Sequence, residues 1–245
     1  YNMPENATIL MVKEPPVFPV NNATYFNVTI LNLSNSVSDV NVTAIRVSVE
    51  GKNEVYDITE TEPEPLPFLL RRGTDQAFKC KRNWSNFAGE NVTVKPVAPN
   101  ASTEGWSITT PNVKLNLTPT FPILESVEYF NLTLENSAES VIDLTISEIM
   151  VDFESISQNV TPSIPRVLLI GQTETFRCDW NWDWYNIGKT NVTITVRTQE
   201  GYESVYETSE LQGAFLFTDE VKFDYTDTTY FDVTIRSSES STATV

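Results

Sequence analysis

The sequence predicts an all-β protein built from tandem β-sandwich domains, and three observations support this fold class. One strand-like segment recurs three times, at residues 25–30, 129–134 and 230–235. Each copy alternates polar with apolar residues, which is the period-two pattern of a half-buried strand. The copies stand about a hundred residues apart, a spacing that fits whole domains rather than the short units of solenoids.

Composition excludes several classes of function. The 245 residues carry a net charge of −17, from 33 acidic and 16 basic residues. This charge argues against nucleic acid or an anionic membrane as a partner, because both bind basic surfaces. Histidine is absent, which removes Ser-His and Cys-His nucleophile pairs and imidazole metal ligands. We therefore expect no enzyme, no cofactor and no metal site.

The chain shows no membrane signal. Its apolar runs are all shorter than the ~18 residues that cross a bilayer. The first residue is Tyr1 rather than Met, which fits a processed mature chain or a fragment. We expect an extracellular protein of the cell surface.

In the first unit, residues 7–12 predict an opening strand, and the prolines that follow force a bend or an edge position. The recurring strand comes next, within residues 24–32. Residues 40–49 form a two-sided strand whose inward face the sequence does not decide. Residues 60–67 hold three prolines among acidic residues and predict an irregular connection.

From residue 69 onward the first two units align in detail. In both, Phe follows a Gly by five residues and Cys follows it by seven; an Asn-Trp pair, a second Gly and an Asn-Val-Thr strand come after. The first unit has Gly73, Phe78, Cys80, Asn83, Trp84, Gly89 and Asn91; the second has Gly171, Phe176, Cys178, Asn181, Trp182, Gly188 and Asn191. The glycines predict reversals between antiparallel strands, where a positive φ is needed.

Closing strands are expected near residues 106–109 and 202–208, and each next unit opens at once. We place the domains at 1–110, 111–211 and 212–245, with almost no linker, so a stiff rod is predicted. About seven strands per unit, joined by Gly, Pro, Asn and Ser turns, predict immunoglobulin-like sandwiches. Two are complete and the third is partial.

The third unit stops after its recurring strand. Two strands cannot enclose a core, so their apolar side chains need cover from a continuation of the chain or from strands of a neighbouring molecule. The residues predicted to carry assembly are Phe215, Phe217, Phe223, Phe231 and Val233.

These motifs together resemble the CARDB-like and S-layer-associated immunoglobulin-type repeats of archaeal surface proteins. The resemblance rests on the recurring aromatic-apolar strand, the Gly-then-Phe-x-Cys step and the Asn-Val-Thr strand after a second Gly. It covers both complete units and the start of the third. Such repeats serve as spacers, adhesins and lattice or filament subunits. Many of them lack the cysteines at positions 80 and 178.

Asparagine is followed by Ser or Thr two residues on at an unusual number of positions. The acceptor sites predicted for N-linked glycans are Asn6, Asn22, Asn27, Asn32, Asn41, Asn83, Asn91, Asn100, Asn116, Asn131 and Asn191; Asn159 also matches but is weakened by the nearby Pro162. The alternative is that Asn-Val-Thr only places polar residues on the solvent face of a strand. We favour glycans because an acidic extracellular β-protein is where such acceptors belong.

The two cysteines occupy the same position in successive units. End-to-end domains would hold them tens of ångströms apart, whereas a disulfide needs Cα atoms within ~7 Å. We expect Cys80 and Cys178 to be small buried residues; a bond to another subunit is the alternative.

The aromatic segment 180–185 offers a second function. Trp180, Trp182 and Trp184 lie on one side of a predicted strand, like a platform for sugars. Asp179, Asn181 and Asp183 face the other way like a small cation cage, but their spacing lacks the Gly and the distal Glu of an EF-hand calcium loop. Trp182 matches Trp84, which favours core packing instead.

The sequence therefore predicts a secreted, glycosylated structural protein that assembles with itself into a filament, sheath or lattice. The alternative is a surface adhesin or carbohydrate-binding module that uses residues 180–185.

Overall fold

The computed structural model describes residues 7–122, 128–181, 191–208, 216–223 and 231–237. In β21 and β22 the described side chains are those of Val233 and Thr234. These parts of the chain form strands β1–β22 and two short 3₁₀ turns. The prediction of an all-β protein with tandem immunoglobulin-like sandwiches is confirmed.

The first sandwich packs a five-stranded sheet against a four-stranded sheet. The first sheet has the order β10 (Ala101–Glu104), β1 (Thr8–Val12), β2 (Phe26–Asn32), β8 (Asp75–Cys80) and β6 (Thr61–Glu62). The second has the order β11 (Trp106–Thr109), β9 (Asn91–Val97), β4 (Ala44–Val49) and β5 (Val55–Ile58). A separate pair, β3 (Val40–Val42) and β7 (Phe68–Leu70), and the turn η1 (Ser85–Phe87) complete the unit.

The second sandwich repeats this plan. One sheet has the order β12 (Leu115–Thr120), β13 (Tyr129–Asn136), β18 (Thr173–Asp179) and β16 (Val160–Thr161). The other has the order β15 (Glu154–Ser155), β14 (Leu144–Val151), β19 (Thr193–Thr198) and β20 (Glu203–Glu207), and β17 (Arg166–Leu168) pairs with β14. The turn η2 (Ser157–Asn159) follows β15, and β21 (Leu216–Phe223) pairs with β22 (Phe231–Ser237) further along the chain.

The recurring strands and the Phe-x-Cys strands form the centre of each core. Phe26, opposite Cys80, and Phe130, opposite Cys178, are fully buried. Along β2 and β13, the residues that alternate with the buried ones face outward, as a period of two requires. The predicted inward faces are therefore confirmed for these strands.

The region whose inward face the sequence left open is two strands rather than one. β3 buries Val40 and Val42, and β4 buries Ile45, Val47 and Val49. Ala44 and Ile45, at the start of β4, are both buried, so the alternation shifts by one residue there and no single phase fits residues 40–49. The acidic connection at 60–67 contains the short strand β6, whose Thr61 lies opposite Cys80.

The two sandwiches differ at their closing strand. In the first sandwich, β10 pairs in parallel with β1. The chain then crosses at Gly105 to the other sheet, where β11 pairs with β9. A Cβ on Gly105 would lie 2.9 Å from the Lys95 side chain and from the Val94 carbonyl oxygen. The corresponding position in the second sandwich is Val205, and β20 stays paired with β19 throughout.

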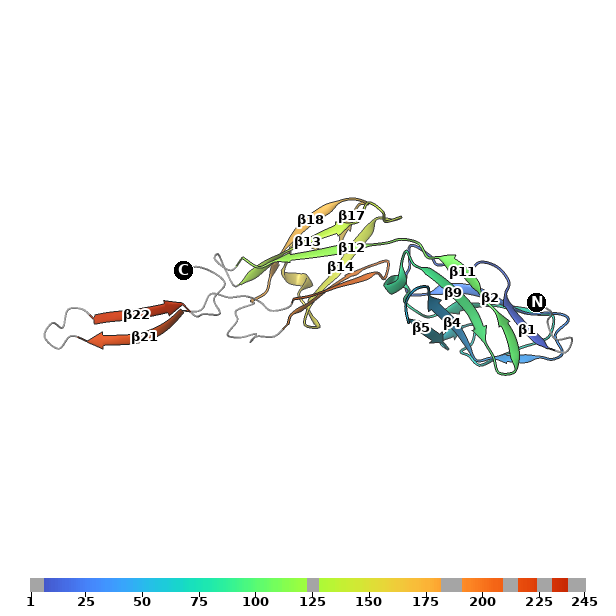
Figure 1. Ribbon diagram of the computed structural model, residues 1–245. Helices are drawn as coiled ribbons and strands as arrows, with labels where there is room; N and C mark the ends of the chain where they lie inside the picture. The colour runs from blue at the N-terminus through green and yellow to red at the C-terminus, as the bar shows by residue number, and fades with distance from the viewer. Residues whose placement is uncertain (1–6, 123–127, 182–190, 209–215, 224–230, 238–245) are drawn as a thin grey trace.

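The sandwiches lie end to end, and the β21–β22 hairpin lies beyond the end of the second sandwich that is far from the first (Figure 1). β11 ends at Thr109 and β12 begins at Leu115, so few residues separate the sheets. The described parts of the chain form an elongated molecule.

Candidate functional site: the joint between the sandwiches

The joint is made by the turn between β19 and β20, whose tip reaches into the first sandwich. Gly201 has φ +84 at this tip, a conformation that favours glycine. A Cβ there would lie 2.9 Å from Cγ2 of Thr24. The tip therefore approaches the first sandwich as closely as backbone alone allows.

Three hydrogen bonds cross the joint. The main-chain N–H of Ala23 donates to the carbonyl oxygen of Glu200 at 2.7 Å. Nδ2 of Asn83 donates to the carbonyl oxygen of Gly201 at 2.8 Å. The hydroxyl of Tyr202 donates to the carbonyl oxygen of Val20 at 2.9 Å. Together they satisfy polar groups that the contact withdraws from water.

Tyr202 anchors the contact. Its side chain is only 3% exposed, and its ring meets Trp84 edge-on, with centroids 5.6 Å apart. Burial, followed by the nearby charge of Glu200, raises the pKa of the Tyr202 phenol well above its ordinary value. A buried, hydrogen-bonded aromatic of this kind contributes strongly to an interface.

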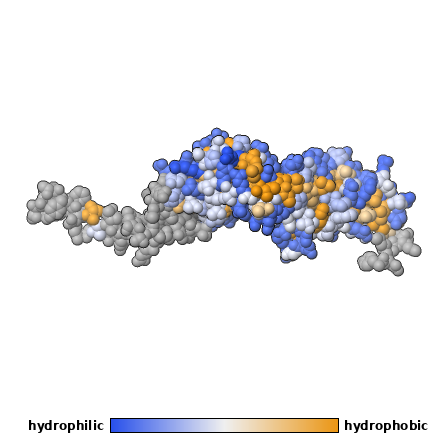
Figure 2. Space-filling model, turned by 90° about the horizontal axis from the view of Figure 1, so that it is seen from above, coloured by the Kyte–Doolittle hydropathy of each residue, from blue (hydrophilic) through white to orange (hydrophobic). Residues whose placement is uncertain are grey.

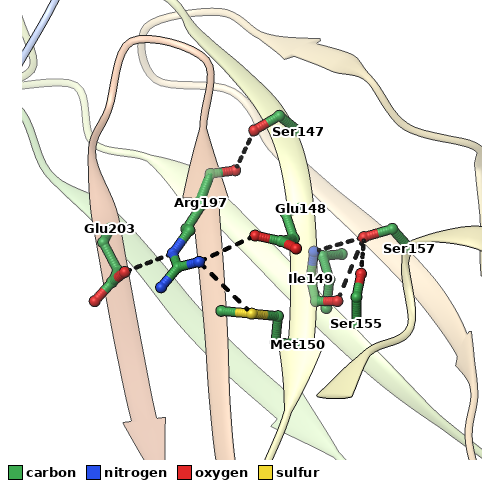
Figure 3. Close-up of polar contacts among 8 residues, drawn as sticks. All are labelled: Ser147, Glu148, Ile149, Met150, Ser155, Ser157, Arg197 and Glu203. Carbon is green, nitrogen blue, oxygen red and sulfur yellow. Dashed lines mark hydrogen bonds and ion pairs between the residues drawn. The ribbon is translucent and has the colours of Figure 1, made fainter. Parts of the chain in front are cut away.

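Exposed ion pairs link the β19–β20 hairpin, which carries the tip, to the neighbouring strand β14. The guanidinium of Arg197 in β19 donates to Glu203 in β20 at 2.7 Å and to Glu148 in β14 at 3.2 Å (Figure 3). Each exposed ion pair contributes ~0–1 kcal/mol. These ion pairs link β14, β19 and β20 near the tip, and they contribute little to stability.

The linker is bound on both sides. The N–H of Gly89 in the first sandwich donates to the carbonyl oxygen of Pro111, and the N–H of Val141 in the second donates to that of Asn112. The N–H of Lys114 donates to Oγ of Ser140. The linker therefore has little freedom to act as a flexible hinge.

An open pocket of about 570 Å³ lies beside the linker, with walls from both sandwiches. Ser85 and Glu90 come from the first sandwich, Asn112 from the linker, and Leu117, Tyr202 and Tyr206 from the second.

The predicted glycan acceptors differ in their accessibility. The exposed ones are Asn41, Asn83, Asn91, Asn100, Asn159 and Asn191, and the half-buried ones are Asn22, Asn27, Asn116 and Asn131. Asn6 lies outside the described residues. Most of these side chains therefore have a solvent-exposed face in the folded chain.

Asn32 is a correction to the predicted set. Its side chain is 0% exposed, and Nδ2 donates to the carbonyl oxygens of Ser38 and Leu70 at 3.1 Å each. Asn136 makes the same two bonds in the second sandwich, to Ile142 and Leu168. A glycan on Asn32 is incompatible with this fold, because its nitrogen is enclosed and bonded at the corner of a sandwich.

The predicted assembly residues fall largely outside the described side chains. Phe215 lies outside the described residues, and Phe217, Phe223 and Phe231 lie in strands β21 and β22 without described side chains. Val233 is 43% exposed in β22. Among the described strands, β21 and β22 pair only with each other.

The aromatic segment does not begin as an open platform. Trp180 is half-buried against the core, and its ring meets Phe130 edge-on at 6.1 Å. Trp182, Trp184 and Tyr185 lie outside the described residues. Trp84, the counterpart of Trp182, is fully buried. Asp179, part of the suggested calcium site, is paired with Arg177 at 2.8 Å.

Both cysteines lie buried, each within its own sandwich. Burial raises the pKa of the Cys80 and Cys178 thiols to about 12. This placement agrees with the packing interpretation.

The described residues hold neither a cluster of metal ligands nor a membrane-spanning helix. No group of three His, Cys, Asp or Glu side chains within them could hold a metal ion. The same residues contain no helix with the length and hydrophobicity needed to cross a membrane.

Comparison with known proteins does not assign the chain to a family. No protein-family model matches the chain, and no curated protein matches its sequence. Among solved structures, the chain is similar to Tp47, the 47-kilodalton lipoprotein of Treponema pallidum, with 12% identity and a TM-score of 0.29. The match covers 84% of this chain and 52% of the lipoprotein, so the chain spans about half of that protein's length.

The joint residues were missed by sequence reasoning. Tyr202 breaks the repeat, because its counterpart in the first unit is Ser102. That departure from the repeat is the sequence signal that distinguishes Tyr202.

Proposed function

We propose that this chain is a secreted, glycosylated structural protein of the cell surface that assembles with copies of itself into a filament, sheath or lattice. Its role is mechanical rather than catalytic. The observation that carries the proposal is the joint, where Tyr202 is buried in the neighbouring sandwich and three hydrogen bonds cross the contact. A joint of this kind lets a tandem array keep a fixed repeat.

Open strand edges support self-assembly. β21 and β22 have no other partner among the described strands, and edges of this kind pair readily with strands of another molecule. Val233 is an exposed apolar side chain on β22. Figure 2 also shows apolar surface gathered along one face near the middle of the molecule, as expected of interaction surfaces.

Exposed sequons support glycosylation, and the net charge of −17 supports solubility of the surface. The resemblance to archaeal S-layer-associated repeats agrees with this location and stays a prediction.

Intact mass of the native chain tests the sugar load: we expect a mass above that of the polypeptide, in steps of whole monosaccharides. A native mass equal to the bare chain would refute glycosylation.

Assembly is tested by electron microscopy and sedimentation of the purified chain and two matched variants. Val233→Lys and Thr234→Lys add the same charge at neighbouring exposed positions of β22, but on opposite faces. We expect ordered polymers of the native chain and an at least tenfold higher critical concentration for Val233→Lys, equivalent to ~1.4 kcal/mol. Thr234→Lys should have a smaller effect. A native chain that stays monomeric at every concentration would refute self-assembly.

A further inference from the structure

The second sandwich leaves open a strand position that the first sandwich fills. In the first, β1 lies between β2 and β10. In the second, β12 takes the place of β1, because Leu115 lies opposite Asn136 as Leu10 lies opposite Asn32. Among the described strands, β12 pairs only with β13. The strand that corresponds to β10 is therefore missing from the described part of this sheet.

The closing strand of the second sandwich does not fill the position. Gly105 lets the first closing strand cross between sheets, whereas Val205 stands at the corresponding place and β20 stays paired with β19. Oγ of Ser204 in β20 donates to the carbonyl oxygen of Leu115 at 2.8 Å, but the main chains of β12 and β20 do not pair in the described structure. The edge of β12 beyond Leu115 is thus left open.

Leu117 carries free main-chain groups at this edge. The carbonyl oxygen of Lys114 accepts from the N–H of Ser137, next to β13, at 3.0 Å. Main-chain groups of successive residues point to opposite sides of a strand, so those of Leu117 point away from β13. They have no hydrogen-bond partner among the described residues. Pro119, the next residue that points this way, has no N–H, so Leu117 offers both a donor and an acceptor to an incoming strand.

The hairpin strand β22 has an open side that suits this edge. Its counterparts each have a strand on both sides, because β2 lies between β1 and β8, and β13 lies between β12 and β18. Among the described strands, β22 pairs only with β21. It has seven residues and β12 has six, so the two edges match in length. In the same chain the hairpin lies beyond the far end of the second sandwich and does not pair with β12 (Figure 1).

We propose that the open edge of β12 receives β22 of a second copy of this chain, in the sheet position that β10 fills in the first sandwich. The incoming strand bonds to the N–H and C=O of Leu117 and lies beside the pocket at the joint, where Val205 and Tyr206 are exposed. Donor and acceptor are different surfaces of one chain, so the contact repeats from copy to copy. This inference rests on the proposed self-assembly and names the surface that performs it.

Two substitutions at Leu117 test the edge. Leu117→Pro removes the N–H that an incoming strand needs and keeps the bonds to β13, because the main-chain groups of Leu117 point away from that strand. Pro119 shows that β12 accommodates proline at a position of this kind. Leu117→Ala shortens the same half-buried side chain but keeps the N–H, so it is the matched control for lost packing. In sedimentation we expect a critical concentration at least tenfold higher for Leu117→Pro than for Leu117→Ala; equal values would overturn the proposal.

Hydrogen exchange in the unchanged chain reads the edge without any substitution. The Leu117 amide should exchange at least tenfold more slowly in polymers than in monomers below the critical concentration, because it gains a partner. Val12, at the corresponding position of β1 beside β10, is the internal control and should exchange equally in both. Polymers in which the Leu117 amide exchanges as in monomers would overturn the proposed edge and leave self-assembly standing.

A peptide of residues 231–237, the sequence of β22, separates this inference from the proposed function. Added to the monomeric chain, it should slow exchange at the Leu117 amide, whereas a scrambled peptide should not. If the chain forms no polymers at any concentration, self-assembly is refuted; protection of Leu117 by the peptide would still support the β12 edge as the acceptor of β22. A peptide that leaves Leu117 unprotected at millimolar concentration would overturn that assignment.

Discussion

At the scale of single residues, the buried side-chain amides of Asn32 and Asn136 make equivalent hydrogen bonds in the two sandwiches. Each Nδ2 donates to two carbonyl oxygens of neighbouring loops and strands. The sequence showed an Asn at the end of both recurring strands, but its sequon pattern marked only Asn32 and suggested the surface. A sequon records which residues are adjacent in the chain and carries no information on burial.

Asn32→Ala should lower the free energy of unfolding of the first sandwich by ~1–3 kcal/mol, because the buried carbonyl oxygen of Leu70 and the part-buried one of Ser38 lose their donor. Asn35→Ala, at an exposed neighbouring position, should change it by less than ~0.5 kcal/mol. Urea unfolding of both variants measures the difference. Equal effects would show that the corner amide does not support the sandwich.

The buried thiols predict a pH dependence. Unfolding returns Cys80 and Cys178 from a pKa of about 12 to the ordinary 9.0. Below pH 9 both states hold the proton. Between pH 9 and 12 the unfolded chain loses it first, so the free energy of unfolding falls as pH rises. At pH 10.5 we expect a loss of ~2 kcal/mol per thiol, measured by urea unfolding. A double Cys→Ala variant with the same loss between pH 8 and 10.5 would contradict this cause.

At the scale of elements, period-two alternation was enough to predict the inward faces of the recurring and Phe-x-Cys strands. It failed at residues 40–49, where the phase of burial changes between Ala44 and Ile45 at the start of β4. The alternation also did not indicate that β10 pairs with β1 rather than with β9. The sheet that this strand joins depends on the crossing at Gly105, which the hydrophobic pattern does not reveal.

Gly105→Val should destabilise the first sandwich by ~1–3 kcal/mol, because the new side chain overpacks against Lys95 and Val94. The reciprocal change, Val205→Gly, should cost only ~0.5–1 kcal/mol, since β20 runs straight and Val205 is exposed. Thermal unfolding ranks the two. A larger loss from Val205→Gly would refute the assigned role of the crossing.

At the scale of the whole molecule, the short joins between repeats predicted a stiff array, but the means of stiffening lay beyond sequence reasoning. The contacts that would fix the joint come from a turn tip, a buried tyrosine and a linker bonded on both sides. These contacts join residues far apart in the chain, such as Val20 and Tyr202, and no local pattern pairs them.

Tyr202→Ala should loosen the joint without unfolding either sandwich, because it removes the ring that packs on Trp84 and the bond to Val20. We expect a loss of ~3–5 kcal/mol from the contact and a smaller maximum dimension in small-angle X-ray scattering as the chain bends. Tyr206→Ala, at a partly exposed position of the adjoining strand β20, is the control and should leave the scattering curve unchanged.

The most direct test of the central claim, a fixed end-to-end joint, is the distribution of distances between spin labels in the two sandwiches. Labels on Asn41→Cys and Glu154→Cys, both at exposed positions, report it while the native thiols stay buried. The account predicts one narrow distribution that broadens in Tyr202→Ala. A broad distribution in the native sequence, unchanged by Tyr202→Ala, would contradict it.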